Sequence, residues 1–114
     1  MPLPEEFSVE DLARAAAEPD RGGLTRAGRS LHKHGSRPGS VYPVPRGSAE
    51  AMNRLALEMV IAILVDPINE VKRRPHGRHG VVLDILSSSG RGLRYRENGA
   101  FINFLEPLSE GEES

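Results

Sequence analysis

Two short alternating segments joined by Asn98-Gly99 constrain the fold of this chain more than any other local feature. The segments are residues 93–97 (LRYRE) and 100–105 (AFINFL). Asn-Gly is the preferred pair for a type I′ turn, in which a two-residue loop joins two antiparallel strands. The sequence therefore predicts a β-hairpin whose register is fixed by that loop.

This register places the two faces of the hairpin in different environments. It pairs Tyr95 with Ile102 and Arg94 with Asn103, and neighbouring pairs point to opposite faces of a sheet. The face predicted to cover a core helix is apolar and consists of Leu93, Tyr95, Ile102 and Phe104. The face predicted to be open and cationic, and thus able to hold a ligand, carries Arg94, Arg96 and Asn103.

β-branched and aliphatic residues predict the other strands. Residues 81–86 (VVLDIL) predict one strand, and residues 68–72 predict a short strand at the edge of the sheet. Between them, residues 73–80 (RRPHGRHG) predict a basic loop that carries His76 and His79.

Two helices are predicted before residue 36. Ser8, followed by an acid three residues later, forms a capping-box pattern ahead of a helix from residue 9 to about 17. Thr25 can cap a second helix that runs to residue 33 or 34. Gly35 is predicted to close this second helix in the left-handed conformation.

A third helix is predicted to begin after Ser48 and to end at Asp66-Pro67. Asn53 and Glu58 are predicted to face water, and the last two turns, which are apolar all round, to be buried. Together these patterns predict an α+β fold. Two to three N-terminal helices pack on one face of a small, mostly antiparallel sheet of three to four strands.

Length and composition fit one domain with one modest core, since the chain has 114 residues of which 38% are apolar. The absence of cysteine excludes disulfides, a thiol nucleophile and thiolate metal ligands. No signal-peptide pattern and no apolar run of about 20 residues occurs, so a soluble protein without a membrane segment is expected. The acidic residues 108–114 predict a disordered tail.

Charge is partitioned along the chain. Residues 1–20 carry a net charge of −5, residues 21–79 one of +7, and residues 80–114 one of −3. Within the basic part, residues 24–47 contain five Lys or Arg and no carboxylate. A ligand that binds there should be an anion, and a phosphodiester is the obvious candidate. The alternative is that these charges form a solvated surface.

His34 is predicted to lie at the seam between the second helix and the body of the protein. It shares the apolar side of the helix with Leu31, whereas Arg29 and Lys33 lie around the other side. RNA carries its own nucleophile, the 2′-hydroxyl, so a base, an acid and cations suffice to cleave it without a metal. A histidine can act as either acid or base, although His34 can equally be a satisfied core residue.

Other chemistries fit the sequence less well. The four histidines form H-x-H and H-x-x-H pairs among arginines that would repel a cation, so neither a metal site nor a cofactor is predicted. Residues 87–89 (SSS) are better explained by a turn than by a nucleophile elbow. Two further interpretations stay open: a non-catalytic RNA- or partner-binding module on the same fold, and a structural protein that docks an acidic partner.

Three segments together resemble a known family: LTRAGRSLHKHGSRPGSVYP (24–43), ILVDP (63–67) and GRGLRYRENGAFINFLEP (90–107). They resemble the C-terminal toxin domains of bacterial polymorphic toxins, such as contact-dependent inhibition proteins and filamentous-haemagglutinin-like exoproteins. Those domains are similar to the ribonuclease superfamily of barnase, EndoU, colicin RNases and RelE. The resemblance covers residues 24–107 as the toxin-like domain, which leaves residues 1–23 as an acidic N-terminal segment with a short helix.

The resemblance implies a four-stranded antiparallel sheet after the helices, metal-independent RNase activity through 2′-hydroxyl attack, and tRNA as a frequent target. It also implies a cognate immunity or antitoxin protein as partner, and a cytoplasmic site of action after secretion or delivery. Carried over by position, the K-H-G-x-R-P-G block becomes Lys33, His34 and Arg37, and the G-R-G-x-R block becomes Arg91 and Arg94.

Local chemistry and this resemblance give the candidate residues. The predicted catalytic residues are His34 as the acid–base group, with Lys33, Arg37 and Arg94 binding or stabilising the phosphate. The predicted substrate-binding residues are Arg29, His32, Tyr42, Arg46, His76, His79, Arg91, Arg96 and Asn103. No metal ligand is predicted.

Overall fold

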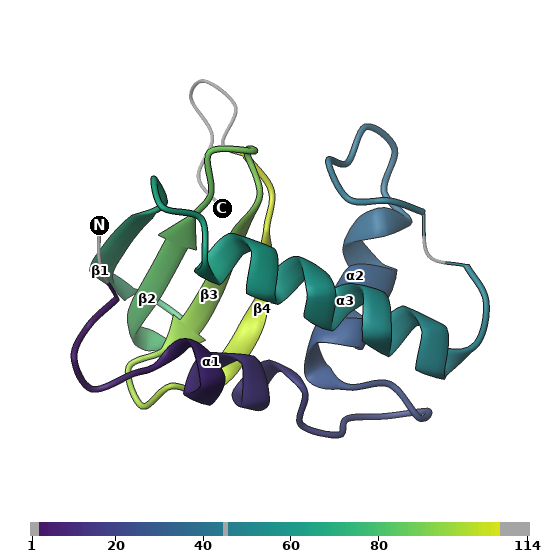
Figure 1. Cartoon of the computed structure of the whole chain (residues 1–114), viewed down its shortest axis with the longest axis horizontal. Coiled ribbons are helices and arrows are strands. Elements are labelled where there is room, and N and C mark those ends of the chain that lie inside the picture. Colours follow the sequence, from purple (N-terminus) through teal and green to yellow (C-terminus); the bar gives the residue numbers. More distant parts are fainter. Residues whose placement is uncertain (1–2, 45, 108–114) are drawn as a thin grey trace.

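Three helices precede a four-stranded sheet (Figure 1). The computed structural model describes residues 3–44 and 46–107. The helices are α1 (Val9–Ala16), α2 (Arg26–Gly35) and α3 (Ala49–Leu64). The strands are β1 (Glu70–His76), β2 (Gly80–Leu86), β3 (Gly92–Arg96) and β4 (Phe101–Leu105). The predicted α+β class, with the helices ahead of the sheet, is confirmed.

Side-chain caps fix the start of each helix, as predicted. The hydroxyls of Ser8, Thr25 and Ser48 each accept a hydrogen bond from a backbone N–H in the first turn. The prediction of a left-handed Gly35 is wrong, because the positive-φ glycines do not include it and it is the last residue of α2. Ser36 follows in the right-handed helical region, so the backbone leaves the helix without a left-handed residue.

The strands form an antiparallel sheet in the order β1-β2-β3-β4. The predicted edge strand at 68–72 exists but is misplaced, because β1 continues to His76. The predicted basic loop 73–80 therefore shrinks to residues 77–79. Pro75 is tolerated within β1 because an edge strand has one side without ladder hydrogen bonds.

The turn between β3 and β4 is not the predicted type I′ turn. That turn needs a positive φ at both central residues, and among the described residues only glycines have one. Gly99 has a φ of 93°, whereas Asn98 does not enter this region. The loop instead spans residues 97–99 and is closed by a 2.8 Å hydrogen bond from Arg96 N to Ala100 O.

An irregularity beside this turn changes which residues of β4 face the core. Arg94 pairs with Asn103 as predicted, but Tyr95 pairs with Phe101 and not with Ile102. Phe101 is 3% exposed and belongs to the core, whereas Ile102 lies outside it. The prediction of Ile102 as a core residue is wrong because it assumed uninterrupted alternation, which a bulge breaks.

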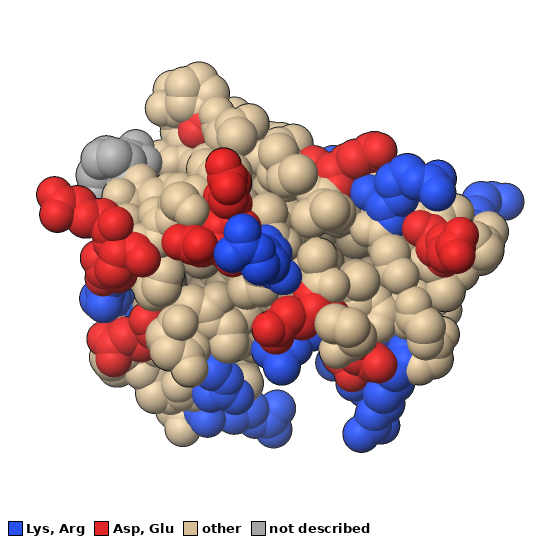
Figure 2. Space-filling view, turned by 60° about the horizontal axis from the view of Figure 1, so that its bottom comes forward, with Lys and Arg blue, Asp and Glu red and all other residues tan. Residues whose placement is uncertain are grey.

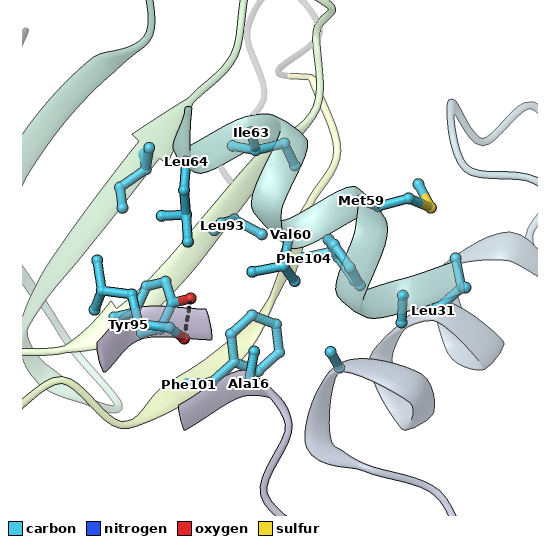
Figure 3. Close-up of a cluster of buried hydrophobic side chains, with 14 of the residues drawn as sticks. Ala16, Leu31, Met59, Val60, Ile63, Leu64, Leu93, Tyr95, Phe101 and Phe104 are labelled. Atoms are coloured by element: carbon cyan, nitrogen blue, oxygen red, sulfur yellow. Dashed lines mark hydrogen bonds between the residues drawn. The ribbon is translucent and has the colours of Figure 1, made fainter. Parts of the chain in front are cut away.

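One apolar core joins the helices to the inner face of the sheet (Figure 3). α3 lies across the sheet, and α2 flanks the β4 edge (Figure 1). Val60 and Leu64 of α3 pack toward Tyr95 of β3, and α1 adds Leu12 and Ala16 to the same cluster. The Tyr95 hydroxyl donates a 2.8 Å hydrogen bond to the Leu12 carbonyl, which ties α1 to the sheet.

Two predictions for α3 are wrong. Its last two turns are not fully buried, since Ile61 is 39% exposed, because the helix packs with one side only. Asn53 does not simply face water. Its Oδ1 accepts a 2.8 Å hydrogen bond from Thr25 N, and its Nδ2 donates a 2.9 Å hydrogen bond to Gly23 O. Asn53 therefore ties α3 to the start of α2.

The acidic N-terminal segment also contacts the sheet. Phe7 packs against the core, and Glu6 accepts a 2.8 Å hydrogen bond from the Arg73 guanidinium of β1. The division of the chain at residue 23 stays a prediction, and the predicted disordered tail lies outside the described residues. Among the described helices, none is long and apolar enough to span a bilayer.

Candidate active site

Helix α2 places basic side chains and a histidine at adjoining positions around its axis, so that both reach the same cleft. Ala27 and Leu31 are buried in the core, and His34, one turn further along, is only 5% exposed. Arg29 and Lys33 are exposed. The predicted position of His34, at the seam between α2 and the body of the protein, is confirmed.

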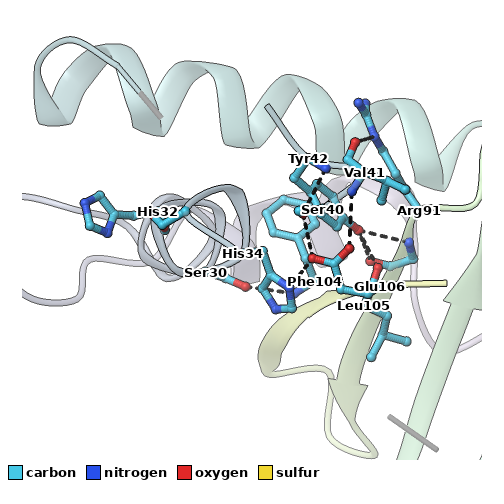
Figure 4. Close-up of polar contacts among 12 residues, drawn as sticks. Ser30, His32, His34, Ser40, Val41, Tyr42, Arg91, Phe104, Leu105 and Glu106 are labelled. Atoms are coloured by element: carbon cyan, nitrogen blue, oxygen red, sulfur yellow. Dashed lines mark hydrogen bonds and ion pairs between the residues drawn. The ribbon is translucent and has the colours of Figure 1, made fainter. Parts of the chain in front are cut away.

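A carboxylate directly after β4 binds this histidine (Figure 4). His34 Nδ1 lies 3.0 Å from Glu106 Oε2. The same carboxylate accepts hydrogen bonds from Ser40 Oγ at 2.7 Å and from Val41 N at 3.3 Å. These bonds hold the carboxylate against the ring and fasten the loop after α2 to the end of β4.

Tyr42 supports the histidine from the side. The two rings meet edge to face, with their centroids 5.7 Å apart, and the ring of Phe104 lies 4.9 Å behind Tyr42. The Tyr42 hydroxyl donates a 2.7 Å hydrogen bond to Leu105 O and accepts one of 3.1 Å from Gly92 N. The aromatic wall beside His34 is thus anchored to the backbone of β3 and β4.

The surroundings of His34 favour the neutral imidazole. Burial lowers the pKa of His34 below its usual 6.5, and the charges of Arg37 and Lys33 lower it further. The hydrogen bond to Glu106 raises the pKa of His34 but does not outweigh these effects. Burial raises the pKa of the Glu106 carboxyl, but the hydrogen bonds it accepts bring it below its usual 4.5.

The tautomer of His34 follows from these contacts. A carboxylate can only accept a hydrogen bond, so Nδ1 of a neutral His34 carries the proton and donates it to Glu106. Nε2 then holds the free lone pair, and it has no hydrogen-bond partner within the described part of the chain. His34 can therefore take a proton from a ligand.

An open cleft of about 470 Å³ lies between α2 and the β3–β4 hairpin, and His34 lines it. Ser30 and Asn103 also line it, and Asn103 Oδ1 is buried without a hydrogen-bond partner among the described residues. Figure 2 shows basic side chains on both sides of a notch at the lower edge of the molecule. The cations that line the cleft are Arg26, Arg29, Lys33 and Arg96. This cleft can take an anion beside His34.

The structure gathers some of the predicted site residues in this cleft and places others elsewhere. His34, Lys33, Arg29, Arg96 and Asn103 line the cleft. The exposed residues outside its lining are His32, Arg37 and Arg46, and Figure 4 shows His32 pointing away from His34. The described residues contain no group of three or more His, Asp or Glu that could hold a metal ion.

Arg91, His76 at the end of β1 and His79 in the β1–β2 turn lie at the margins of the site. The Arg91 guanidinium sits 5.5 Å from the ring centroid of Tyr42 and donates a 3.0 Å hydrogen bond to Val41 O, behind the Glu106 network. His76 and His79 stack on each other at 4.9 Å. Neither histidine lines the cleft.

Arg94 does not lie on an open face, and that prediction is wrong. It is 4% exposed, with Nε 2.7 Å and Nη2 2.9 Å from the carboxylate of Asp84. Arg74 Nε donates to the same carboxylate at 3.1 Å. Asp84 stands directly opposite Arg94 in the β2–β3 register. The charge of Arg94 is therefore paired within the sheet.

Asp20 is the acidic residue in the lining of the cleft, and its Oδ1 lies 3.5 Å from the Arg29 guanidinium. A carboxylate there repels an incoming phosphate and competes for Arg29. Asp20→Asn should raise the affinity for a phosphodiester ligand about two- to fivefold at low ionic strength, with the gain fading as salt is added. Fluorescence anisotropy measures this affinity, and Glu58→Gln on the exposed side of α3 is the charge-matched control. A gain of the same size in the control would contradict a local effect.

Tyr42→Phe should lower the free energy of unfolding by about 1–3 kcal/mol, because Gly92 N and Leu105 O lose a buried partner. The folded variant should keep its activity toward a ligand in the cleft, because the aromatic ring beside His34 remains. Urea denaturation measures the loss of stability. Tyr95→Phe is the matched control, because its buried hydroxyl bonds Leu12 O and Tyr95 does not line the cleft. Full inactivation of a folded Tyr42→Phe protein alone would assign the hydroxyl a chemical role.

Two important residues of the site were not among the candidates. Glu106 binds His34 and accepts a hydrogen bond from Ser40, yet Glu106 is 72 positions from His34 and 66 from Ser40. No local spacing reveals contacts of this length. The available signal was that Glu106 directly follows the last predicted strand, within the F-L-E-P block.

Comparison with known proteins identifies the family. Residues 13–106 match the CdiA C-terminal tRNase toxin domain, a range that contains both His34 and Glu106. The crystal structure of the toxic C-terminal tip of CdiA from Pseudomonas aeruginosa, in complex with immune protein, is similar to this chain, with a TM-score of 0.70 and 27% identity. The match covers 81% of this chain and 98% of that one. No curated protein sequence matches. The chain belongs to the family of CdiA C-terminal tRNase toxin domains.

Proposed function

We propose that this domain cleaves tRNA without a metal ion, by attack of a ribose 2′-hydroxyl on the adjacent phosphate, with His34 as the base. The family is one of tRNase toxins, so the domain is an endoribonuclease. One observation carries the mechanism: the ring of His34 is buried, with Nδ1 3.0 Å from Glu106, in a cleft lined by cations.

His34 acts at the first proton transfer. Nε2 removes the proton of the 2′-hydroxyl, and the 2′-oxygen forms a bond to phosphorus. The imidazolium that results is stabilised by Glu106, which also fixes the tautomer and the orientation of the ring. Glu106 is thus a positioning residue. General-base catalysis of this kind contributes a factor of about 10²–10⁴ to the rate.

Cations on both walls of the cleft hold the phosphate. Arg29 and Lys33 reach it from α2, and Arg96 reaches it from β3. They stabilise the negative charge that develops on the phosphoryl oxygens. The ammonium group of Lys33, next to His34 in the helix, protonates the leaving 5′-oxygen as its bond to phosphorus breaks. The products are a 2′,3′-cyclic phosphate and a 5′-hydroxyl.

The other predicted catalytic residues receive indirect roles in this proposal. Arg37 lies outside the cleft lining, and its charge helps to keep His34 neutral by lowering the pKa of the imidazole. Arg94 holds β2 and β3 together through Asp84. Neither side chain needs to touch the phosphate.

A toxin that degrades tRNA acts in the cytoplasm of the cell it enters and must be neutralised in the cell that makes it. The similar Pseudomonas aeruginosa tip is complexed with immune protein. We propose a cognate immunity protein for this domain as well. Co-expression with the gene adjacent to its own, followed by purification as one complex, would support this partner.

The decisive experiment for the reaction is incubation of the purified domain with total tRNA in excess EDTA. Discrete fragments that end in 2′,3′-cyclic phosphate are the expected result. The alternative is a non-catalytic RNA-binding module, which would shift intact tRNA on a native gel with a steep dependence on salt. Cleavage that stops in EDTA and resumes with added Mg²⁺ would contradict metal independence.

Glu106→Gln should slow cleavage and move the acidic limb of the pH–rate profile to lower pH. The carboxylate raises the pKa of His34, so an amide in its place lets that pKa fall further. The base form then persists to more acidic pH, while the imidazolium loses its counter-ion. Single-turnover rates across the acidic range measure both effects, with Glu58→Gln as control. If the variant cleaves more slowly but its acidic limb stays at the same pH, Glu106 does not act through the pKa of His34.

A further inference from the structure

A second pocket adjoins the cleft at the turn ends of the sheet. It has a volume of about 430 Å³, and we name it the turn pocket. Its lining consists of His79, Gly80, Val81, Arg96, Glu97 and Asn98. Arg96 lines the cleft as well, so one guanidinium is shared by the two sites.

His79 has an unused polar atom in this region. Its Nδ1 is buried and has no hydrogen-bond partner among the described residues. Two contacts hold the neighbouring His76. Its ring stacks on the His79 ring, with centroids 4.9 Å apart and an interplanar angle of 27°, and its Nδ1 accepts a hydrogen bond from Arg78 N. A buried ring nitrogen without a partner costs free energy unless a ligand supplies one.

The electrostatics of the turn pocket favour an anion. Burial lowers the pKa of His79, and the neighbouring His76 ring and the charges of Arg96 and Arg78 lower it further. The nearby carboxylates are already paired. Glu97, in the lining of the pocket, accepts a 3.2 Å hydrogen bond from Arg73, and the Asp84 carboxylate is held by two arginines.

The spacing between the two sites suits one RNA strand. Asn103 of the cleft lies on β4 and the turn pocket begins where β2 starts, so two strand spacings, or about 10 Å, separate them. The charges of a nucleic-acid strand recur at intervals shorter than this separation. One strand can therefore place a phosphate in each site.

We propose that the turn pocket binds a second phosphate of the RNA strand, next to the site where the phosphate beside His34 is cleaved, through Arg96 and His79. This inference rests on the proposed function, because it assigns the same substrate to the adjoining site. Arg96 lies between the two phosphates and spans them. The stacked rings of His76 and His79 offer a flat surface for the base that follows.

Two substitutions test the turn pocket without touching the cleft. His79→Ala removes the proposed hydrogen bond to phosphate. Asn98→Asp adds a negative charge but keeps the side-chain oxygen that accepts from Ala100 N. Ala62→Glu, on the exposed side of α3, is the control for an added charge. Circular dichroism checks that each variant is folded.

The first measurement is the affinity for tRNA, by anisotropy, with each substitution placed in the His34→Ala protein so that the RNA stays intact. His79→Ala and Asn98→Asp should each weaken binding on the order of tenfold, as expected for a hydrogen bond to a charged group, and Ala62→Glu should not. Affinities equal to that of the control would overturn the proposal, whether or not the wild type cleaves RNA.

The second measurement compares cleavage of tRNA with cleavage of a dinucleotide, which has a single phosphate and cannot reach the turn pocket. Both variants should raise KM for tRNA, leave kcat unchanged and leave dinucleotide kinetics unchanged. Equal losses on the two substrates would place His79 in the cleft and overturn the second site. Failure of the wild type to cleave either substrate, with the affinity differences intact, would contradict the proposed reaction and retain the turn pocket as a binding site.

Discussion

His34→Ala should reduce the single-turnover rate of tRNA cleavage by about 10²–10⁴, the usual contribution of a general base. Among the described residues that line the cleft, the ring of His34 combines a pKa below its usual 6.5 with a lone pair left free by a bond to a carboxylate. His34→Gln fills more of the buried site and should lose the same activity, because an amide cannot accept the 2′-hydroxyl proton.

Stability must be separated from chemistry in this experiment. Removing a ring that is 5% exposed leaves a cavity and a Glu106 carboxylate without one of its partners. Tyr95→Phe is the control, because it also loses a buried hydrogen bond but does not line the cleft. Rates are compared at a temperature where circular dichroism shows all variants folded. A folded His34→Gln protein that cleaves as fast as the wild type would remove His34 from the mechanism.

Asp84→Asn should lower the free energy of unfolding by about 3–5 kcal/mol, because it leaves the Arg94 guanidinium buried without its counter-ion. Arg94 and Asp84 are each 4% exposed, and two hydrogen bonds of 2.7 and 2.9 Å join them. Urea denaturation measures the change. Glu70→Gln, which removes an exposed pair with Lys72 at 3.8 Å, should cost less than about 1 kcal/mol.

The pH dependence of this loss has a defined sign. Burial raises the pKa of Asp84, but its hydrogen bonds to Arg94 and Arg74 outweigh burial, so the net pKa lies below its usual 3.8. A depressed carboxyl pKa contributes stability above the unfolded value, and that stability is lost as the pH falls through the folded value. The difference between wild type and Asp84→Asn should shrink over that range. A difference that is small at neutral pH would contradict the buried pair.

Local sequence patterns predicted the elements of this fold well where neighbouring residues decide the structure. Ser8, Thr25 and Ser48 cap their helices through residues a few positions away, so their roles could be read directly from the sequence. The hairpin was predicted for the same reason. Its turn type was not, because Asn98 adopts a negative φ and β4 absorbs the mismatch with an irregularity beside Tyr95.

Long-range partners account for what could not be predicted in the site. The helical periodicity of α2 was enough to turn His34 toward the body of the protein, but not to name Glu106 across the fold. Arg94 looked free because the sequence alone did not set the register of β2 against β3, which brings Asp84 opposite it. The alternation of side chains along a strand predicts which face of the sheet a residue lies on. Whether its charge is free to bind a ligand depends on the side chains of the neighbouring strand.

The most direct test of this account is the pH–rate profile of single-turnover tRNA cleavage in excess EDTA. The account predicts activity without metal and an acidic limb whose midpoint lies below the usual histidine value of 6.5, since burial lowers the pKa of His34. The limb should disappear in His34→Gln. Residual cleavage that keeps the same limb in that variant, or activity that EDTA abolishes, would contradict a neutral His34 as the catalytic base.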